Sequence, residues 1–423
     1  MDLDDINLPA DWRTGKLVDL CELVSDQCDP GKTDHTIYVG LEHIDPGAFI
    51  FSRYGKPGDV VSAKNQFRKG DILYGKLRPY LDKAVFADRE GICSTDILVF
   101  RPHRNVSPLF VLALIHSKSF AEYAVQTTHG VNHPRTSWTA LKDFPCLIAP
   151  SREQRRIAAV LWKVQEAVAT EVEIVRNALA LKKSLLRGLF MHGLSDEPRK
   201  ETPYGEVPEK WDIQLLSECA HVQTGVAKGR TIDPSEMIEV PYLRVANVQA
   251  GHLDLSEIKN IQIRRDELER YSLRKDDVVL TEGGDFDKLG RGFIWDGQIE
   301  PCVHQNHIFA VRPHRDRLSP NYFAYLIQSS YGRGYFLAVA HKTTNLACIN
   351  TNKLKAFPVL IPPLADQERI ASILQTVDAK IAVHEAKQRA LQNLFKTLLH
   401  QLMTAQLRVN HLDIDTSGVE VAV

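Results

Sequence analysis

The strongest constraint on this 423-residue chain is an internal repeat. Short motifs in the first half return in the same order in the second half, at an offset that grows from 198 to 213 residues. Self-similarity of this kind marks duplicated structural units. The chain is therefore a tandem duplication rather than two unrelated domains. The repeated positions are 9–12 and 208–211, Leu17 and Leu215, Cys21 and Cys219, 68–71 and 274–277, 101–104 and 312–315, 144–145 and 357–358, and 154–158 and 367–371.

Each repeat opens with a region of mixed pattern. Short β-rich runs alternate with Gly, Pro and Asp turns, and a helical stretch follows Ser107-Pro108 and Ser319-Pro320. This mixture predicts an α+β domain in each half. The expected strands cover residues 71–74, 96–100, 277–280 and 307–311, and the expected helices cover about 109–123 and 321–331.

Each repeat closes with a long helix. Apolar residues, with a few polar ones that a seam can accommodate, recur at alternating steps of 4 and 3. This pattern predicts a coiled-coil seam. Pro150 and Pro362-Pro363 precede the two helices, and Gly193 follows the first. Burial of both seams is simplest in an antiparallel pair, with Glu171, Lys182, His384 and Gln388 as polar interruptions that fix the register. The seam positions are 157, 161, 164, 168, 171, 175, 178, 182, 185 and 189 in the first helix, and 370, 374, 377, 381, 384, 388, 391, 395, 398 and 402 in the second.

Composition places the chain among soluble globular proteins. The net charge is −1, so any nucleic-acid binding depends on local patches rather than on bulk charge. No apolar run approaches the 18 residues or so of a membrane span, and the first residues are acidic where a signal peptide is basic. The seven cysteines are scattered and never spaced as C-x-x-C, which favours a reducing cytoplasm.

Catalytic motifs are missing from the sequence. Gly31-Lys32-Thr33 resembles the end of a phosphate loop, but Asp26 stands where that motif requires its first glycine. His304 and His307 have a spacing that could suit a metal, yet no recognised ligand set surrounds them, and we interpret them as a strand and a turn histidine. We therefore expect no catalytic residue, no metal site and no cofactor in this chain.

Several longer motifs together resemble one known family. These are the two P-x-x-W copies, 204–211 (YGEVPEKW), 242–248 (YLRVANV), 280–292 (LTEGGDFDKLGRG), 74–81 (YGKLRPYL) and 363–371 (PLADQERIA). In order and duplication they are similar to the specificity subunits of type I restriction–modification enzymes. The resemblance covers nearly the whole chain.

The resemblance implies a fold and a division of labour. It implies two target-recognition domains, each reading one half of a bipartite, asymmetric DNA site, held apart by two antiparallel helices that form a pseudo-twofold coiled-coil spacer. It implies no activity in this chain, two methylation subunits that carry S-adenosylmethionine, and a restriction subunit that uses ATP and Mg. The expected boundaries are 1–150 and 211–363 for the recognition domains, 151–193 and 364–408 for the helices, 194–210 for an exposed linker and 409–423 for a tail.

The charge of the two expected recognition domains departs from a simple DNA binder. Residues 1–150 and 201–363 each carry two more acidic than basic side chains, whereas residues 151–200 carry four more basic than acidic ones. We therefore expect one basic face on each domain, helped by the first helix and by partner subunits. The partners are expected to dock on helix faces away from the seam and near 154–158 and 367–371.

Candidate DNA-reading residues come from loops with clustered basic, amide and small side chains, because Arg and Lys suit guanine and Asn and Gln suit adenine. The motif 101–104, identical in 312–315, is assigned to structure or phosphate contact, Trp12 and Trp211 to the core, and Cys21 and Cys219 to small buried groups. The candidates are Lys76, Arg78, Tyr80, Lys83, His129, Asn132, His133 and Arg135 in the first half, and Arg244, Asn247, Asp285, Lys288, Arg291, His341, Lys342, Thr343, Thr344 and Asn345 in the second.

Two other functions remain open on the sequence. One is a coiled-coil scaffold that presents two protein-binding heads, and the other is a hydrolase or nuclease with an unrecognised site. Sequence-specific DNA binding together with a methyltransferase partner separates the first from a specificity subunit. A metal-dependent activity of the purified chain would support the second.

Overall fold

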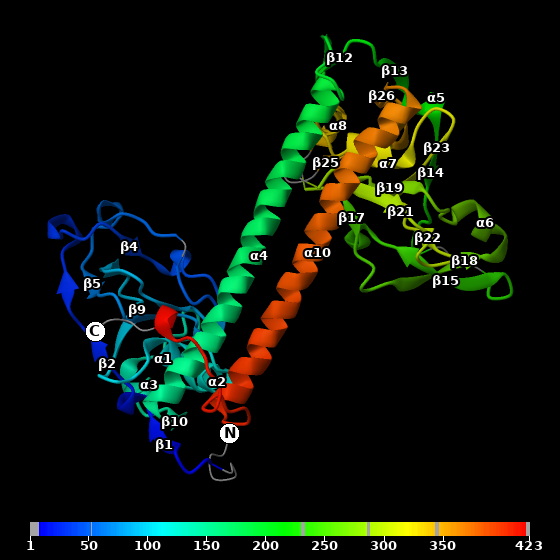
Figure 1. Ribbon diagram of the computed structural model, residues 1–423. Helices are drawn as coiled ribbons and strands as arrows, with labels where there is room; N and C mark the ends of the chain where they lie inside the picture. Colours follow the sequence, from blue (N-terminus) through cyan, green and yellow to red (C-terminus); the bar gives the residue numbers. More distant parts are fainter. Residues whose placement is uncertain (1–7, 52, 230–232, 286–287, 343–346, 420–423) are drawn as a thin grey trace. The chain divides into compact units, whose positions relative to one another are not determined.

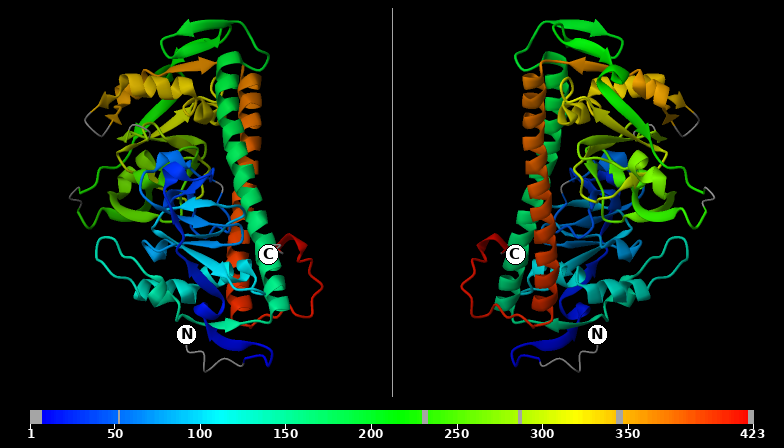
Figure 2. Two further views of the ribbon diagram at one scale, coloured as in Figure 1. Left: turned by 90° about the vertical axis from the view of Figure 1, so that its left-hand side faces the viewer. Right: turned by 90° about the vertical axis from the view of Figure 1, so that its right-hand side faces the viewer.

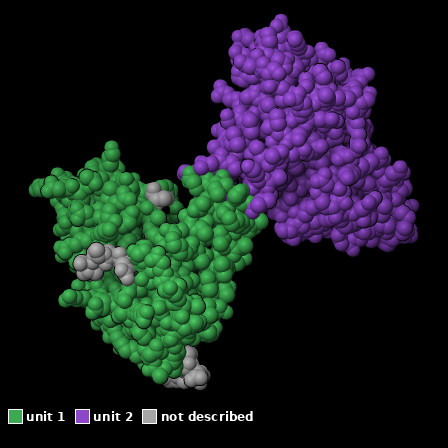
Figure 3. Space-filling view, viewed as in Figure 1, with its two compact units in different colours: residues 1–174, 384–423 green, residues 175–383 purple. Residues whose placement is uncertain are grey.

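The computed structural model describes residues 8–51, 53–229, 233–285, 288–342 and 347–419. The chain forms two compact units, which Figure 3 shows in different colours. Unit 1 comprises residues 1–174 and 384–423, and unit 2 comprises residues 175–383. Each unit therefore combines one α+β head with parts of both long helices.

The head of unit 1 is built on two four-stranded sheets. Strands of the first sheet pair antiparallel throughout, and in the second sheet β4 and β8 are parallel. Buried residues from both sheets fill the head, so the sheets carry its core. The first sheet has the order β2 (Cys21–Val24), β9 (Ile97–Pro102), β6 (Ile72–Gly75), β7 (Ala84–Phe86), and the second has the order β3 (Gln27–Cys28), β5 (Lys64–Phe67), β8 (Gly91–Cys93), β4 (Tyr38–Val39). A further pair joins β1 (Arg13–Lys16) to β10 (Pro145–Ile148).

The head of unit 2 repeats this plan. Its four-stranded sheet has the same order of equivalent strands, and its second sheet again contains a parallel pair, β15 with β22. The two sheets are β14 (Ala220–Thr224), β23 (Ile308–Pro313), β19 (Asp277–Thr281), β21 (Gly292–Trp295), and β18 (Lys259–Arg264), β15 (Met237–Leu243), β22 (Val303–His304). Smaller pairs are β13 (Asp212–Leu215) with β26 (Pro358–Ile361) and β16 (Val248–Gln249) with β17 (His252–Leu253). The α+β class predicted for both halves is confirmed.

The helical stretch after each central strand is two helices rather than the single one expected. In unit 1, α1 (Pro108–Ile115) ends before Ser117, whose side chain accepts a hydrogen bond from Phe120 N and caps α2 (Lys118–Gln126). In unit 2, Ser329 caps α8 (Ser330–Val339) after α7 (Pro320–Leu326) in the same way. Serine favours this position because its hydroxyl satisfies a free amide at the helix start. Shorter helices are α3 (Trp138–Leu141), α5 (Leu216–Cys219), α6 (Leu268–Tyr271) and α9 (Thr351–Lys355).

The repeated arginine motif is structural. Arg101 donates from Nε and Nη2 to the carboxylate of Asp71 at 2.9 and 2.8 Å. Arg312 makes the same bidentate contact with Asp277 at 2.7 and 2.6 Å. Both carboxylates are buried, so these arginines compensate charges inside the heads. Trp12, Trp211, Cys21 and Cys219 are buried as predicted.

Two long helices connect the heads, α4 (Ser151–His192) and α10 (Leu364–Met403) (Figure 1). All twenty predicted seam positions are buried or half-buried, which confirms the heptad pattern. The second helix ends five residues before the expected 408, because Ala405 takes a left-handed conformation with φ 57° that cannot continue a helix. Burial of the seam leaves the opposite faces of both helices in solvent.

Polar contacts set the register of the helix pair within each unit. In unit 1, His384 Nδ1 and Lys387 Nζ lie 2.6 and 2.7 Å from the Glu171 carboxylate. In unit 2, Lys182 Nζ lies 2.6 Å from Asp378 Oδ1. Three of the four predicted polar interruptions therefore make cross-helix contacts, as a register-fixing role requires.

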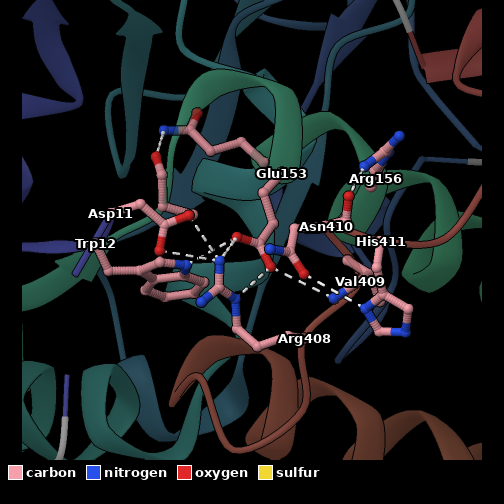
Figure 4. Close-up of polar contacts among 10 residues, drawn as sticks. Asp11, Trp12, Glu153, Arg156, Arg408, Val409, Asn410 and His411 are labelled. Atoms are coloured by element: carbon pink, nitrogen blue, oxygen red, sulfur yellow. Dashed lines mark hydrogen bonds and ion pairs between the residues drawn. The ribbon is translucent and has the colours of Figure 1, made fainter. Parts of the chain in front are cut away.

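The C-terminal segment contributes to the core of unit 1, and Figure 4 shows the polar contacts that it makes there. The buried carboxylate of Glu153, near the start of α4, accepts hydrogen bonds from Trp12 Nε1 at 2.9 Å and from Arg408 Nε and Nη2 at 2.7 Å each. Arg408 also contacts Asp11 at 2.8 Å, and both carboxylates raise the pKa of its guanidinium. Val409 beside it is buried. The N-terminal motif, the start of α4 and the segment after α10 thus meet at one carboxylate. The start of α4 therefore lies beside the end of α10, as in an antiparallel helix pair.

The segment 194–210 is folded rather than an exposed linker. It contains a hairpin of β11 (Arg199–Thr202) and β12 (Gly205–Pro208). Val207 is completely buried in the core of unit 2, and the Tyr204 ring lies 5.1 Å from that of Tyr335. Burial of its apolar side chains therefore holds this segment against unit 2. Its Pro-rich and charged composition does not predict this packing.

The repeated segments at the helix starts contain buried glutamines, whereas Glu368 and Arg369 beside Gln367 are exposed. Gln154 accepts from Ser107 N and donates to Ala149 O, and Gln367 makes the equivalent contacts with Ser319 N and Pro362 O. Both amides are buried. Among the described residues, no helix has the length and apolarity that crossing a membrane requires.

Replacement of Arg408 tests the joint around Glu153. Arg408→Met should lower the free energy of unfolding by about 2–4 kcal/mol, because it leaves a buried carboxylate without its cation. Urea unfolding followed by circular dichroism measures the change. Arg389→Met, on the exposed side of α10, is the matched control and should change stability by less than about 0.5 kcal/mol. Equal effects of the two substitutions would contradict the assigned role.

Acid titration tests the Glu171 contact. Hydrogen bonds from Lys387 and then His384 hold the pKa of Glu171 below its ordinary value of 4.5. The ionised carboxylate therefore stabilises the folded chain above that pH, and this contribution is lost as the pH falls through the lowered pKa. We expect Glu171→Gln to be less stable than the wild type at pH 7. The difference in stability between the two proteins should become smaller below pH 4.5. Thermal unfolding at several pH values measures it, and Glu368→Gln, exposed on α10, should show no such trend.

Candidate nucleic-acid interface

The two heads share a backbone arrangement that we call the strand-end junction, where three segments meet just beyond the central strand. In unit 1, Lys76 N donates to Asp96 O at 2.9 Å, and Thr136 N donates to Lys76 O at 3.1 Å. In unit 2, Glu282 N donates to His307 O at 2.9 Å, and Ile349 N donates to Glu282 O at 2.9 Å. The junction is defined by Lys76, Asp96 and Arg135 in unit 1, and by Glu282, His307 and Cys348 in unit 2.

Side chains at the two junctions differ completely although their backbones match. In unit 1, Arg135 donates from Nε and Nη2 to the carboxylate of Asp96 at 3.0 and 3.3 Å, and this contact raises the pKa of Arg135. In unit 2, His307 Nδ1 lies 2.6 Å from Glu282 Oε2, and Cys348 is exposed. One backbone thus carries a guanidinium–carboxylate pair in one head and an imidazole–carboxylate pair in the other.

A tight turn follows the junction of unit 1. Arg78 and Asp82 flank the 3-10 turn Pro79–Leu81, and both have left-handed φ angles, 52° and 49°. Non-glycine residues adopt this conformation at an energetic cost, so it persists where surrounding contacts hold it. Arg78 N donates to Pro134 O at 2.8 Å, and the side chains of Arg78 and Tyr80 are exposed. The turn therefore presents a cation and an aromatic ring to solvent.

A buried histidine holds the far end of this turn. His116 Nδ1 lies 2.7 Å from Asp82 Oδ1, and its Nε2 lies 3.1 Å from Ala84 O. Its ring stacks on Phe49 with centroids 5.5 Å apart, and Gly47 N donates to Asp82 O at 2.9 Å. These contacts fix Asp82 in its left-handed conformation.

An exposed loop completes the candidate surface of unit 1. His129 and Arg135 exchange two backbone hydrogen bonds, of 2.9 and 3.0 Å, which close the loop at its base. Asn132 and His133 at its tip are exposed, and Figure 2 shows the loop (teal) extending from the head. The structure therefore brings together Lys76, Arg78, Tyr80, His129, Asn132, His133 and Arg135 at one end of unit 1.

The corresponding surface of unit 2 is a small three-stranded sheet. Its order is β20 (Gly283–Gly284), β25 (Ala347–Cys348), β24 (His341–Lys342). His341 and Lys342 are exposed, and the side chains of Asp285 and Lys288 form an ion pair beside β20. The candidates Thr343, Thr344 and Asn345 lie outside the described residues.

Four other candidates form hydrogen bonds within the protein, which favours a structural role for them, and we leave them out of the proposed contacts. Lys83 Nζ donates to Leu41 O at 2.6 Å. The buried Asn247 amide donates to Asp254 O and Glu257 O, and Arg244 donates to the same Glu257 carbonyl at 2.8 Å. Arg291 Nη1 donates to Gln249 Oε1 at 3.0 Å. They hold loops in place, a role that residue type alone does not reveal.

Sequence reasoning misses four residues of the junctions, which are Asp96, Glu282, His307 and Cys348. Asp96 and His307 begin the expected strands 96–100 and 307–311, and Glu282 and Cys348 are not candidates. A signal for them exists, because Asp96 and His307 immediately precede equivalent strands, β9 and β23, and differ between otherwise matching repeats. Divergence at equivalent loop positions is what two heads with different ligands require.

His304 lies inside the head of unit 2. It is completely buried, its Nδ1 lies 2.9 Å from Ile308 O, and burial lowers its pKa to about 4. Within the described residues, no group of three or more His, Cys, Asp or Glu side chains could hold a metal ion.

Comparisons with known proteins agree with this organisation. The model of the type I restriction modification DNA specificity domain matches residues 208–393. The MjaVIII specificity subunit of Methanocaldococcus jannaschii is 21% identical over 441 residues, which cover 97% of this chain and 96% of the relative. This chain is thus similar to the type I restriction–modification specificity subunits over nearly its whole length. Some other curated relatives match over about half their length, among them the EcoDI specificity subunit of Escherichia coli, 26% identical over 47% of this chain and 45% of the relative.

Solved structures support the fold. The type I restriction–modification S subunit of M. genitalium has a TM-score of 0.58 and 14% identity, and the match covers 95% of this chain and 97% of that one. A chain from a study of complex assembly in a type I system has a TM-score of 0.55, with 20% identity and coverage of 95% and 100%. The predicted architecture of two repeated heads with long helices is confirmed by these structures.

Proposed function

We propose that this chain is a non-catalytic subunit that recognises a bipartite, asymmetric DNA sequence and directs methylation and restriction subunits to it. The observation that carries the proposal is the strand-end junction, which repeats its backbone in both heads and changes its side chains. Protein side chains read a DNA sequence through hydrogen bonds to base edges, whereas contacts to the DNA backbone carry no sequence information directly. Two strand-end junctions with the same protein backbone but different side chains therefore suit two different half-sites.

The proposed DNA contacts are exposed or half-buried groups on the junction side of each head, together with residues 343–345, which are proposed from the sequence alone. Each head has a slight excess of acidic residues, so local cations rather than bulk charge attract the duplex. Tyr80 offers an apolar surface beside Arg78, and the loop from His129 to Arg135 can reach into a groove. The proposed set is Lys76, Arg78, Tyr80, His129, Asn132, His133 and Arg135 in unit 1, and Asp285, Lys288, His341, Lys342, Thr343, Thr344 and Asn345 in unit 2.

In this proposal α4 and α10 act as the spacer between the two half-sites. Their 42 and 40 residues correspond to about 60 Å of helix each. Polar contacts at the buried Glu171 and the half-buried Lys182 oppose sliding of one helix along the other. A fixed register is what a constant spacing between half-sites requires.

Two methylation subunits are the proposed partners, because the outward helix faces repeat as the heads do. Arg176, Lys183 and Arg187 on α4 have exposed counterparts on α10, which are Arg389, Lys396 and His400. Leu181 and Leu394 are also equivalent, and they are 51% and 45% exposed. Equivalent surfaces accept the same partner twice. S-adenosylmethionine then belongs to the methylation subunits, and ATP and Mg belong to a restriction subunit.

Native mass spectrometry of the co-expressed complex checks this stoichiometry. We expect two methylation subunits for each copy of this chain. Leu181→Glu should reduce the complex to one methylation subunit, because it places a charge on one of the two equivalent surfaces. Val61→Glu, at a residue that is 97% exposed in the head of unit 1, is the control and should leave two. A stable one-to-one complex of the wild type would overturn the proposal.

Replacement of one head tests the recognition function. A host that expresses the chain with its methylation subunit should show a split adenine-methylated motif by methylome sequencing. Substitution of residues 8–150 by the first head of another specificity subunit should change one half of that motif and leave the other unchanged. A change in both halves would contradict modular recognition. Absence of any methylated motif, together with capture of a protein ligand by the heads, would support the scaffold alternative.

A further inference from the structure

The guanidinium of Arg135 has two hydrogen-bonding edges, and Asp96 holds one of them. The bonds of 3.0 and 3.3 Å come from Nε and Nη2, so the edge formed by Nη1 and the second Nη2 hydrogen is not used in this pair. The Arg135 side chain is 45% exposed and that of Asp96 is 29% exposed. The pair therefore lies at the surface with one edge of a planar cation held and the other edge turned away from its carboxylate.

The backbone beneath this guanidinium is also held. Arg135 exchanges two hydrogen bonds with His129 and forms a bridge with Leu77. The neighbouring Thr136 N donates to Lys76 O. Both the chain and the side-chain end of Arg135 are therefore positioned before any ligand binds, which lowers the entropy lost on binding.

We propose that Arg135 recognises a guanine in the half-site read by unit 1, and that Asp96 is the positioning residue for this contact. The proposal rests on the DNA-recognition function proposed above. Guanine presents two acceptors, O6 and N7, in the major groove, and an arginine edge with two parallel N–H groups matches them. The carboxylate of Asp96 occupies the Nε edge, so the end edge is directed at the base.

Unit 2 does not repeat this contact. Cys348 occupies the position of Arg135, and His307 occupies the position of Asp96. His307 is directed to Glu282 at 2.6 Å instead. The arginine–guanine contact is thus confined to one half-site, which makes the effect of a substitution specific to one position of the motif.

Substitutions in the co-expressed complex test the assignment. Binding of the complex to its methylation motif is measured for duplexes with each base pair of the half-site replaced in turn. Arg135→Ala should lose discrimination at one G·C pair by roughly 10- to 100-fold, and leave the other positions unchanged. Asp96→Asn should lose part of that discrimination, because the arginine remains but is no longer held by a charge. Substitution of that guanine by 7-deazaguanine should weaken binding of the wild type and leave Arg135→Ala unaffected.

Controls separate this inference from the proposed function. Cys348→Ala, at the equivalent position of unit 2, should leave the half-site of unit 1 unchanged, and circular dichroism shows whether each variant is folded. A wild-type motif without guanine in that half-site would overturn the assignment of Arg135. Equal weakening of all sequences by Arg135→Ala would also overturn it, since it indicates a phosphate contact. A wild-type complex that methylates no split motif would instead refute the recognition function itself.

Discussion

The seam between α4 and α10 is the constraint on which the rest of the structure depends. Each helix carries an apolar stripe that is too long to remain in water, and in this chain the other helix covers it. The chain leaves on one helix and returns on the other, so each compact unit contains segments distant in sequence. Unit 1 is the extreme case, because its head and the first part of α4 are completed by residues 384–423. The carboxylate of Glu153 lies where these distant parts meet.

The sequence predicted the features that depend on pattern. The heptad steps located both helices and every seam position, and the repeated motifs identified two α+β heads. The split of the helical stretches at Ser117 and Ser329 was within reach, since a serine cap has a local signature. The folded hairpin of 199–208 was not, because burial of Val207 depends on a surface that the rest of unit 2 supplies.

Prediction of the site was less complete, and the reason is chemical. Lys83 and Asn247 have residue types that suit DNA, but their side-chain nitrogens already donate to backbone carbonyls. Such bonds depend on tertiary contacts that composition does not show. Conversely, Asp96 is an acidic residue that no search for DNA contacts selects, and its importance emerges only from its contact with Arg135. Comparison of the two repeats, position by position, is the sequence signal that points to it.

The discontinuity of unit 1 has a consequence for how the protein is made. The 209 residues of unit 2 separate the two parts of unit 1. At a synthesis rate of about 5–20 residues per second, the head of unit 1 leaves the ribosome roughly 10–40 seconds before its second part. During that interval the first part of the α4 seam lacks its partner, and Glu153 lacks the cation of Arg408. Unit 2, although encoded later, is continuous in sequence and can close first, so the nascent chain completes its first head last.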